Sequence, residues 1–343
     1  KIFMIMILQI FLFLLINTLI VFYFETLSKY FNLYDYPLLD RKKQKVPISL
    51  FGGFIFFINF VLFIFFDIFY NNNSFLISLG FNTNIKVFFF LIVFCFIYLI
   101  GYVDDKIDIR PFNRLVLLLT LTFLIVYLNP NFNIKTLRSN LFFNDIDLFF
   151  FGSLFSTLCI VAYMNALNMF DGINLISFLH FFSIPVVFIL ENFLLHFSIL
   201  LGFSLLVYSY LNLKNLTFFG DSGIYILSFI CALMVIDFYD TYKLNVEYVL
   251  IIIFLPMVDF FRLFFVRVYK GNDPFKGDEN HFHHIISKRF NFKIKIFIYI
   301  LFIYIPIFIN YFFGISEFLL LLMIITYFTI IKSIKFNTGH KNE

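Results

Sequence analysis

Long apolar runs alternate with short polar segments along the whole chain. A helix needs about 20 predominantly apolar residues to cross a bilayer. Runs of this kind occur at about 2–24, 50–70, 85–102, 113–129, 148–166, 174–190, 193–211, 221–239, 246–267, 294–312 and 316–334. The pattern therefore predicts an all-α fold, a polytopic transmembrane helical bundle of about 11 helices.

The first run is interrupted only by Gln9 and Asn17, and polar Glu25 and Lys29 follow it without a small-residue cleavage site. We expect it to be retained as a helix. The polar segments between runs reach only roughly 25 residues, so no separate soluble domain is predicted. We expect a single integral-membrane domain over residues 1–343, with its chemistry on short loops and helix ends.

The positive charges are distributed unequally between the two sides that eleven alternating spans would define. One side, which includes the C-terminus, carries 19 Lys and Arg, and the other carries five. Because Lys and Arg concentrate in cytoplasmic loops, we expect the first side to be cytosolic and the N-terminus to lie outside. The predicted cytosolic loops are near 25–49, 103–112, 167–173, 212–220 and 268–293.

The composition agrees with a membrane protein. Hydrophobic residues make up 62% of the chain and charged residues 13%, and the mean hydropathy is +0.95. A soluble domain is closer to half apolar and one quarter charged. The net charge of +4 is explained by the cytosolic loops, so we expect no nucleic-acid partner. Three isolated cysteines within apolar runs read as packing residues.

An aspartate pair, Asp104 and Asp105, lies at the end of one predicted span. Adjacent carboxylates at a helix end repel each other, and a divalent cation or a proton relieves that repulsion. The alternative is a solvated loop in which the aspartates face Lys106 and Arg110. The pair alone does not decide between these two readings.

The segment NALNMFDGIN (165–174) places oxygen-bearing side chains on one helical stripe. Asn165, Asn168 and Asp171 follow each other at intervals of three residues, and Gly172 and Asn174 come next. Such a stripe at a helix C-terminus suits a cation or sugar hydroxyls. A polar cap with Gly172 as the helix stop needs only one of these residues, so we interpret the segment as a site and Asn165 as a substrate-binding residue.

Asp221 opens another predicted helix, between Gly220 and Gly223. Aspartate is a common helix N-cap. However, the glycines allow close backbone approach, and free N–H groups at a helix start receive phosphate oxygens. A carboxylate beside them can hold Mg²⁺ that bridges to a phosphate.

Three histidines, His281, His283 and His284, lie within four positions of a basic loop. Together with Asp278 they could bind zinc, but no cysteine accompanies them and the surrounding Lys and Arg favour anions. The other interpretation is an anion pocket in which imidazole N–H groups bind phosphate oxygens. A further basic segment, 41–53, reads by itself as a lipid-headgroup contact.

Taken in order, these residues resemble the polyprenyl-phosphate N-acetylhexosamine-1-phosphate transferase family, over about residues 33–290. The likeness is closest to the bacterial branch that starts surface glycans on a lipid carrier. The matching segments are RKKQKVPISLFGG (41–53), GYVDDKIDIRP (101–111), NALNMFDGIN (165–174), FFGDSG (218–223), PMVDFFRLFFVR (256–267) and DPFKGDENHFHH (273–284).

The resemblance implies a transfer of sugar-1-phosphate from a UDP-sugar to polyprenyl (undecaprenyl) phosphate that depends on Mg²⁺, with Mn²⁺ as an alternative, and releases UMP. It places the active site on the cytosolic side of the plasma membrane and also allows a homodimer. It implies these roles: Asp221 and Asn168 as metal ligands; Asp104 and Asp105 orienting or deprotonating the lipid phosphate; Asp171 and Asn174 in the nucleotide-sugar pocket; and His281, His283 and His284 holding phosphate or sugar groups.

The chain departs from the family pattern at three sites. The basic loop has Gln44 where histidine is common and Ser49 where proline is common. Asn174-Leu175-Ile176 stands where the family usually has Asp-Gly-Leu after the Asp-Gly of the second motif. The family's Gly-Asp-x-Gly-Ser reads Gly-Asp-Ser-Gly-Ile, so that Ile224 replaces a hydroxyl near the expected metal.

Two other functions compete with this interpretation. An intramembrane prenyltransferase would use the DDxxD pattern at 104–108, but a second aspartate-rich motif of like spacing is missing from the sequence. A secondary transporter of an anionic substrate would place charges near mid-membrane and repeat one half in the other; only Asp259 and Arg262 are candidates for such charges.

Overall fold

The computed structural model describes residues 2–36, 46–70, 74–141, 145–273 and 280–339, and within them the chain is almost entirely helical. The α-helices are α1 (Ile2–Phe22), α2 (Phe24–Phe31), α3 (Gly52–Tyr70), α4 (Ser74–Ser78), α5 (Asn84–Ile107), α6 (Pro111–Leu128), α7 (Gly152–Phe170), α8 (Ile176–Leu190), α9 (Leu195–Leu213), α10 (Gly220–Thr241), α11 (Val246–Ile252), α12 (Phe254–Tyr269), α13 (Phe282–Ser287), α14 (Phe292–Phe313) and α15 (Ser316–Gly339). Two 3₁₀ turns are η1 (Pro130–Phe132) and η2 (Phe149–Phe151).

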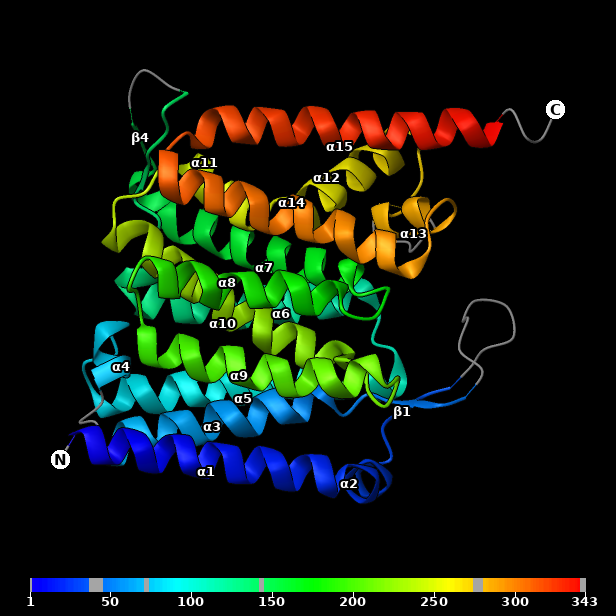
Figure 1. Cartoon of the computed structure of the whole chain (residues 1–343). Helices are drawn as coiled ribbons and strands as arrows, with labels where there is room; N and C mark the ends of the chain where they lie inside the picture. The colour runs from blue at the N-terminus through cyan, green and yellow to red at the C-terminus, as the bar shows by residue number, and fades with distance from the viewer. Residues whose placement is uncertain (1, 37–45, 71–73, 142–144, 274–279, 340–343) are drawn as a thin grey trace.

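Four two-residue strands form two small antiparallel hairpins. β1 (Tyr34–Asp35) pairs with β2 (Ile48–Ser49), and β3 (Thr136–Leu137) pairs with β4 (Ile146–Asp147). The predicted all-α membrane class is confirmed, because these hairpins only close loops at the two ends of the helical bundle (Figure 1).

Eight helices of the described residues are long and apolar enough to cross a membrane, and two bent pairs raise the number to ten. The bent pairs are α1 with α2, at 72°, and α11 with α12, at 89°. Each of the 11 predicted runs contains a helix, but the run at 174–190 forms α8, which has only 15 residues. A helix of that length is shorter than a typical span.

The predicted run 246–267 is not one straight helix. It breaks at Ile253, and Pro256 lies in the first turn of α12. Proline lacks an N–H, and its ring clashes with the carbonyl group four residues earlier. That carbonyl belongs to Ile252, the last residue of α11, so the proline disfavours a straight helix where the chain bends by 89°.

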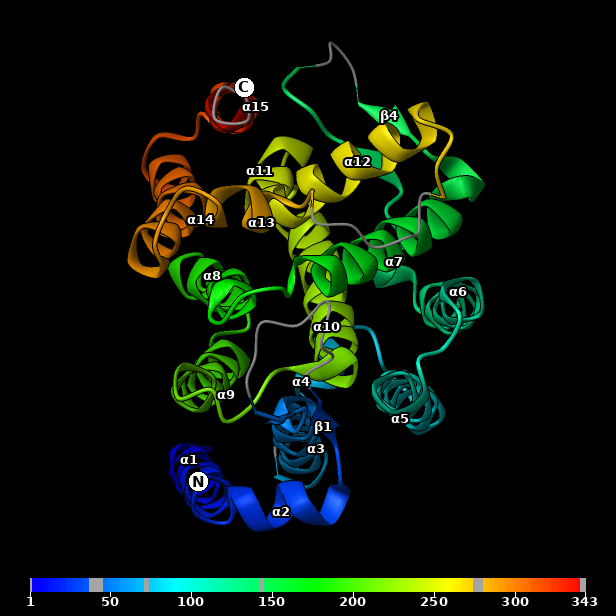
Figure 2. The same cartoon turned by 90° about the vertical axis from the view of Figure 1, so that its right-hand side faces the viewer.

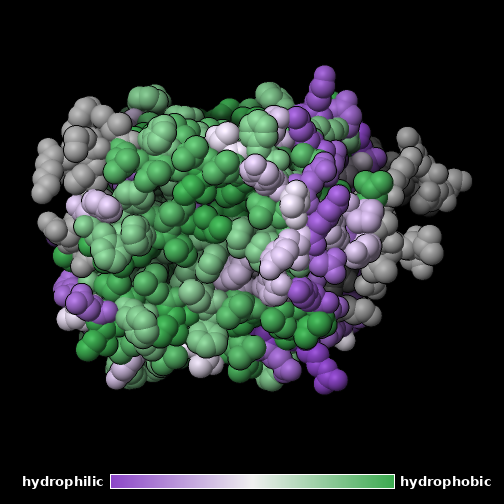
Figure 3. Space-filling view, turned by 90° about the horizontal axis from the view of Figure 1, so that it is seen from below, coloured by the Kyte–Doolittle hydropathy of each residue, from purple (hydrophilic) through white to green (hydrophobic). Residues whose placement is uncertain are grey.

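The spans lie side by side, with α10 at the centre (Figures 1 and 2). Helix α10 contacts α3, α5, α7 and α8 and is buried over its whole span. The outer surface shows a broad apolar band, and hydrophilic residues gather most densely along one edge (Figure 3). That edge is the end of the bundle where β1, α2, α13 and the C-terminus lie, opposite the N-terminus (Figure 1).

Small residues bring α10 close to its neighbours. A Cβ added to Gly101 of α5 would lie 2.3 Å from the Cα of Ser222, and one added to Gly53 of α3 would lie 2.5 Å from the backbone nitrogen of Gly223. Helices in a membrane associate through such close packing, because lipid tails are as apolar as their side chains. The last turn of α5 is thereby held against the first turn of α10.

The two polar residues of the first run bind neighbouring helices. Asn17 and Asn59 of α3 exchange two hydrogen bonds of 2.9 and 3.0 Å, and Gln9 Oε1 contacts His196 Nε2 of α9 at 2.8 Å. Buried polar groups need partners. These contacts fix α1 against α3 and α9.

Candidate active site

The carboxylate of Asp105 covers the N-terminus of α10. Its Oδ1 accepts a hydrogen bond from the backbone N–H of Asp221 at 2.7 Å, and its Oδ2 accepts one from the N–H of Ser222 at 3.2 Å. Gly220 adopts a left-handed φ of +68°, and a Cβ there would lie 2.8 Å from Asp105 Oδ2. The first N–H groups of a helix have no intrahelical partner. Asp105 supplies that partner from another helix.

The neighbouring carboxylate, Asp104, forms an ion pair with Arg114 of α6. Arg114 Nη1 lies 2.7 Å from Asp104 Oδ2, and the Asp104 side chain is only 1% exposed. The backbone N–H of Ile109 donates to Asp104 Oδ1 at 2.7 Å, and the Tyr225 hydroxyl donates to Oδ2 at 3.4 Å. All four oxygens of the aspartate pair therefore accept hydrogen bonds within the protein.

Asp221 joins α7, α6 and α10 at one point. Asn168 Nδ2 donates to Asp221 Oδ1 at 2.5 Å, and Arg114 Nη1 lies 4.0 Å from Asp221 Oδ2. The Asp221 side chain is 32% exposed, unlike that of Asp104. Of the two carboxylates beside Arg114, Asp221 is the one that a ligand can reach.

These residues fit a magnesium ion whose coordination is completed by waters and substrate phosphates. Among the residues that the structure describes, no three His, Cys, Asp or Glu side chains form a metal cage. Mg²⁺ characteristically binds one or two carboxylates together with waters and substrate phosphates. The open carboxylate of Asp221 satisfies that requirement. Asn168 presents its amide nitrogen to Asp221, so it would serve as an oxygen ligand only after its amide group turns.

The end of α7 meets the histidine loop at Gly172. A Cβ at Gly172 would lie 2.2 Å from His283 Nε2, so only glycine allows this contact. Asp171 is the residue after α7 ends, and burial raises the pKa of its carboxyl to about 6. His283 is 2% exposed, and burial lowers the pKa of its imidazole to about 3. Asp171 and the histidines therefore belong to one region.

The histidine loop is anchored by Asp259 of α12. Asp259 Oδ2 lies 3.0 Å from His281 Nδ1, and its Oδ1 accepts hydrogen bonds of 2.6 Å from Arg262 and from the Tyr327 hydroxyl. The backbone N–H of Phe282 also donates to this carboxylate. The rings of His281 and His283 stack with centroids 5.4 Å apart, and His284 lies 4.2 Å from His283 by the same measure.

Two predicted site residues make other contacts. Asn165 donates to the carbonyl of Val161 in its own helix at 2.8 Å. Asn174 donates to the Asn212 carbonyl at 3.1 Å and to Asn215 Oδ1 at 2.6 Å, beyond α9. Asn174 thus ties the chain after α7 to the segment before α10. The basic residues 41–45, together with Asp278, lie outside the described residues.

Three contributors are not assigned to the site by the sequence pattern. Arg114 reads as a loop cation, Tyr225 as an apolar helix residue, and Asp259 as an interior charge. A usable signal exists for Asp259 alone, because an aspartate within an apolar run must be paired or functional.

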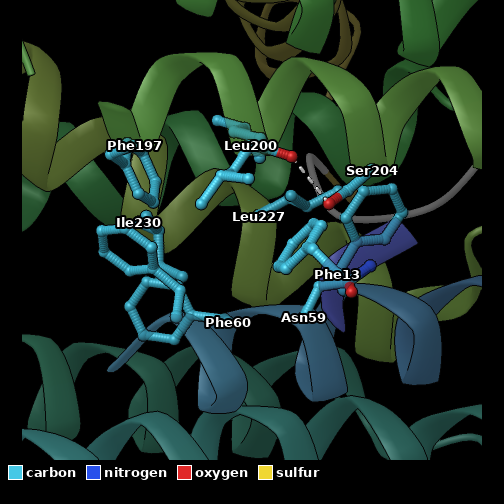
Figure 4. A pocket seen from close by; sticks show the side chains of 11 residues that line it. Phe13, Asn59, Phe60, Phe197, Leu200, Ser204, Leu227 and Ile230 are labelled. Atoms are coloured by element: carbon cyan, nitrogen blue, oxygen red, sulfur yellow. Dashed lines mark hydrogen bonds between the residues drawn. The ribbon is translucent and has the colours of Figure 1, made fainter. Parts of the chain in front are cut away.

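The cavity drawn in Figure 4 does not belong to this site. It has a volume of about 30 Å³ and lies between α1, α3, α9 and α10, lined by residues such as Phe13, Phe60, Leu200 and Ile230. Its lining is almost wholly apolar, and its volume is close to that of one water molecule. A cavity of this volume holds neither a UDP-sugar nor a polyprenyl phosphate.

Comparison with known families agrees with the geometry. Residues 87–239 match the profile of glycosyl transferase family 4. The match runs from α5 to α10 and includes the aspartate pair, Asn168, Asp171 and Asp221. A search of curated proteins gave no match. Over these residues the chain is similar to glycosyl transferase family 4, the family of membrane enzymes that transfer a sugar-1-phosphate to polyprenyl phosphate.

Proposed function

We propose that this enzyme transfers an N-acetylhexosamine-1-phosphate from a UDP-sugar to polyprenyl phosphate, releases UMP and makes the first lipid-linked intermediate of a cell-surface glycan. The observation that carries the proposal is the meeting of Asp104, Asp105, Asn168, Asp221 and Arg114 at the ends of four helices. Helix ends at a membrane surface are where a lipid phosphate and a water-soluble nucleotide sugar can meet.

The charge asymmetry supports a cytosolic site in the plasma membrane. The aspartate pair, Asp221 and the histidine loop fall on the side to which the alternation of predicted spans assigns 19 Lys and Arg. Because cytoplasmic loops carry this excess, UDP-sugars from the cytosol would enter on that side.

Phosphoryl transfer requires positioning and charge stabilisation more than covalent assistance. Asp221 and Asn168 would hold Mg²⁺, or Mn²⁺ in its place, and the bound ion offsets the repulsion between two anionic phosphates. Arg114 places a cation beside Asp221, where a developing negative charge benefits from it.

The contacts favour an orienting role for Asp104 and Asp105. Each of their oxygens already accepts a hydrogen bond from the protein, so both carboxylates are held in fixed orientations. We propose that the pair fixes Arg114 and the start of α10, and thereby the seat of the lipid phosphate. Asp171 and the histidines His281, His283 and His284 would bind the nucleotide sugar.

The prenyltransferase alternative gains no support from the structure. Helix α5 ends at Ile107, and Asp108 lies beyond it with a left-handed φ of 52° and an exposed side chain. The third aspartate of the DDxxD pattern therefore does not continue the helical face of Asp104 and Asp105.

The decisive assay incubates membranes that contain the protein with labelled UDP-N-acetylhexosamines, polyprenyl phosphate and Mg²⁺. We expect UMP release and a labelled lipid product with at least one sugar. A known family member serves as the positive control. Absence of UMP release with every UDP-sugar, under conditions where that control is active, would reject the proposal.

A further inference from the structure

Tyr225 lies on α10 one helical turn after Asp221, so both side chains lie on the same side of the helix. The tyrosine is fully buried. Its hydroxyl donates to Asp104 Oδ2 at 3.4 Å, the same oxygen that accepts from Arg114 Nη1 at 2.7 Å. Two helices thus supply donors to one carboxylate oxygen.

The ring of Tyr225 also supports the guanidinium of Arg114. The Arg114 Cζ lies 5.8 Å from the ring centroid, within the range of a cation–π contact. Arg114 Nη1 lies 2.7 Å from Asp104 Oδ2 and 4.0 Å from Asp221 Oδ2. The guanidinium therefore has an aromatic ring beside it and two carboxylates near one of its nitrogens.

The residue before Tyr225 cannot supply a polar contact here. Ile224 is 1% exposed and packs in the main apolar core. The Tyr225 hydroxyl, one residue further along α10, does supply such a contact, to Asp104.

We propose that Tyr225 is a positioning residue that acts through Arg114. Its hydroxyl holds Asp104 and its ring holds the guanidinium, so that the cation stays directed toward Asp221 and the reacting phosphates. This inference rests on the proposed function and assigns to it a residue outside the aspartate and histidine motifs.

The test compares Tyr225→Phe, which keeps the ring, with Tyr225→Leu, which removes ring and hydroxyl. Tyr299→Phe is the matched control, because Tyr299 is equally buried and its hydroxyl has no hydrogen-bond partner among the residues that the structure describes. We expect kcat to fall about tenfold in Tyr225→Phe and about a hundredfold in Tyr225→Leu, with KM for both substrates within about twofold of wild type. The control should retain wild-type kcat.

A structural defect alone could also lower kcat, so the second measurement is a double-mutant cycle with Arg114→Lys. Lysine cannot lie flat on an aromatic ring as a planar guanidinium does. If Tyr225 acts through Arg114, Tyr225→Leu will lower kcat by much less than about a hundredfold in the Arg114→Lys background. Fully multiplicative effects would overturn the inference, as would an unchanged kcat in Tyr225→Phe.

The wild type in the same assay separates the two proposals. An active wild type with an equally active Tyr225→Phe variant overturns the role of Tyr225 and leaves the proposed function standing. A wild type that releases no UMP overturns the proposed function and this inference together.

Discussion

The carboxylate of Asp105 on α5 accepts a 2.7 Å hydrogen bond from the backbone N–H of Asp221 on α10. Asp105 therefore fixes the start of α10, the part of the helix that carries Asp221. The two side chains have different surroundings, because Asp105 is bound to the helix end and Asp221 remains 32% exposed. This division of roles is not visible in the sequence, where both belong to acidic motifs of similar appearance.

Replacement of Asp105 by alanine should destabilise the protein. Loss of a helix-capping side chain costs about 0.5–2 kcal/mol, and here it leaves the N–H groups of Asp221 and Ser222 without the acceptor that Asp105 provides. Chemical unfolding in detergent measures the change in the free energy of unfolding.

Asp108→Asn is the control for that experiment, because Asp108 is exposed and asparagine tolerates a left-handed φ. We expect a change of less than about 0.5 kcal/mol. Equal destabilisation by Asp105→Ala and Asp108→Asn would contradict the capping role.

Asp221→Asn tests the expected metal ligand. Asparagine keeps the shape of the side chain but removes the negative charge that would hold Mg²⁺. We expect kcat to fall by about 10²–10³-fold, the usual effect of removing one electrostatic contact to a transition state. The measurement is UMP release as a function of Mg²⁺ concentration, and full activity of this variant would show that another residue holds the metal.

Much of the helical frame could be predicted because spans leave a strong apolar signal. The grouping of Asp104, Asn168 and Asp221 was also predictable, since their runs end or begin on the same side of an alternating bundle. What the alternation cannot give is the contact partner of each side chain. Arg114 reaches the site only because the chain turns tightly at Asp108, with its left-handed φ, before α6 begins.

Other details depend on local backbone geometry that the sequence does not announce. Leu175 has a left-handed φ of +68°, and the chain there turns so that Asn174 binds the end of α9. The break before Pro256 likewise redirects α12, which brings Asp259 to the histidine loop. Periodicity predicts where a helix exists, but a kink or a left-handed residue decides what its neighbours contact.

Asp259→Asn should weaken binding of the nucleotide sugar. The variant removes the charge that holds His281 and leaves Arg262, whose side chain is 8% exposed, without its counter-charge. Breaking a buried ion pair costs about 3–5 kcal/mol of stability, and we expect KM for the UDP-sugar to rise about tenfold.

Asp240→Asn is the control for Asp259→Asn, because its ion pair with Arg138 is 55% exposed on the aspartate side and lies at the other end of α10. Exposed pairs contribute at most about 1 kcal/mol. The steady-state KM and the unfolding free energy of both variants decide the matter, and an unaltered KM in Asp259→Asn would separate the histidine loop from substrate binding.

The stability of the protein should depend on pH through His283. Burial lowers the pKa of its imidazole to about 3 in the folded protein, while the unfolded value is about 6.5. Between these values the unfolded chain binds a proton that the folded chain does not, so acid favours unfolding. The stability contribution is fully present above pH 6.5 and is lost as the pH falls toward 3.

From pH 7.5 to pH 5 this single group should remove about 2 kcal/mol of stability. Glutamine does not titrate, so the free energy of unfolding of His283→Gln should fall by about 2 kcal/mol less than that of the wild type between pH 7.5 and pH 5. Unfolding curves in detergent at the two pH values, for wild type and variant, give the comparison directly. Parallel losses in both proteins would mean that His283 is already accessible to protons in the folded state, and the imidazole would then be free to carry a positive charge toward a phosphate.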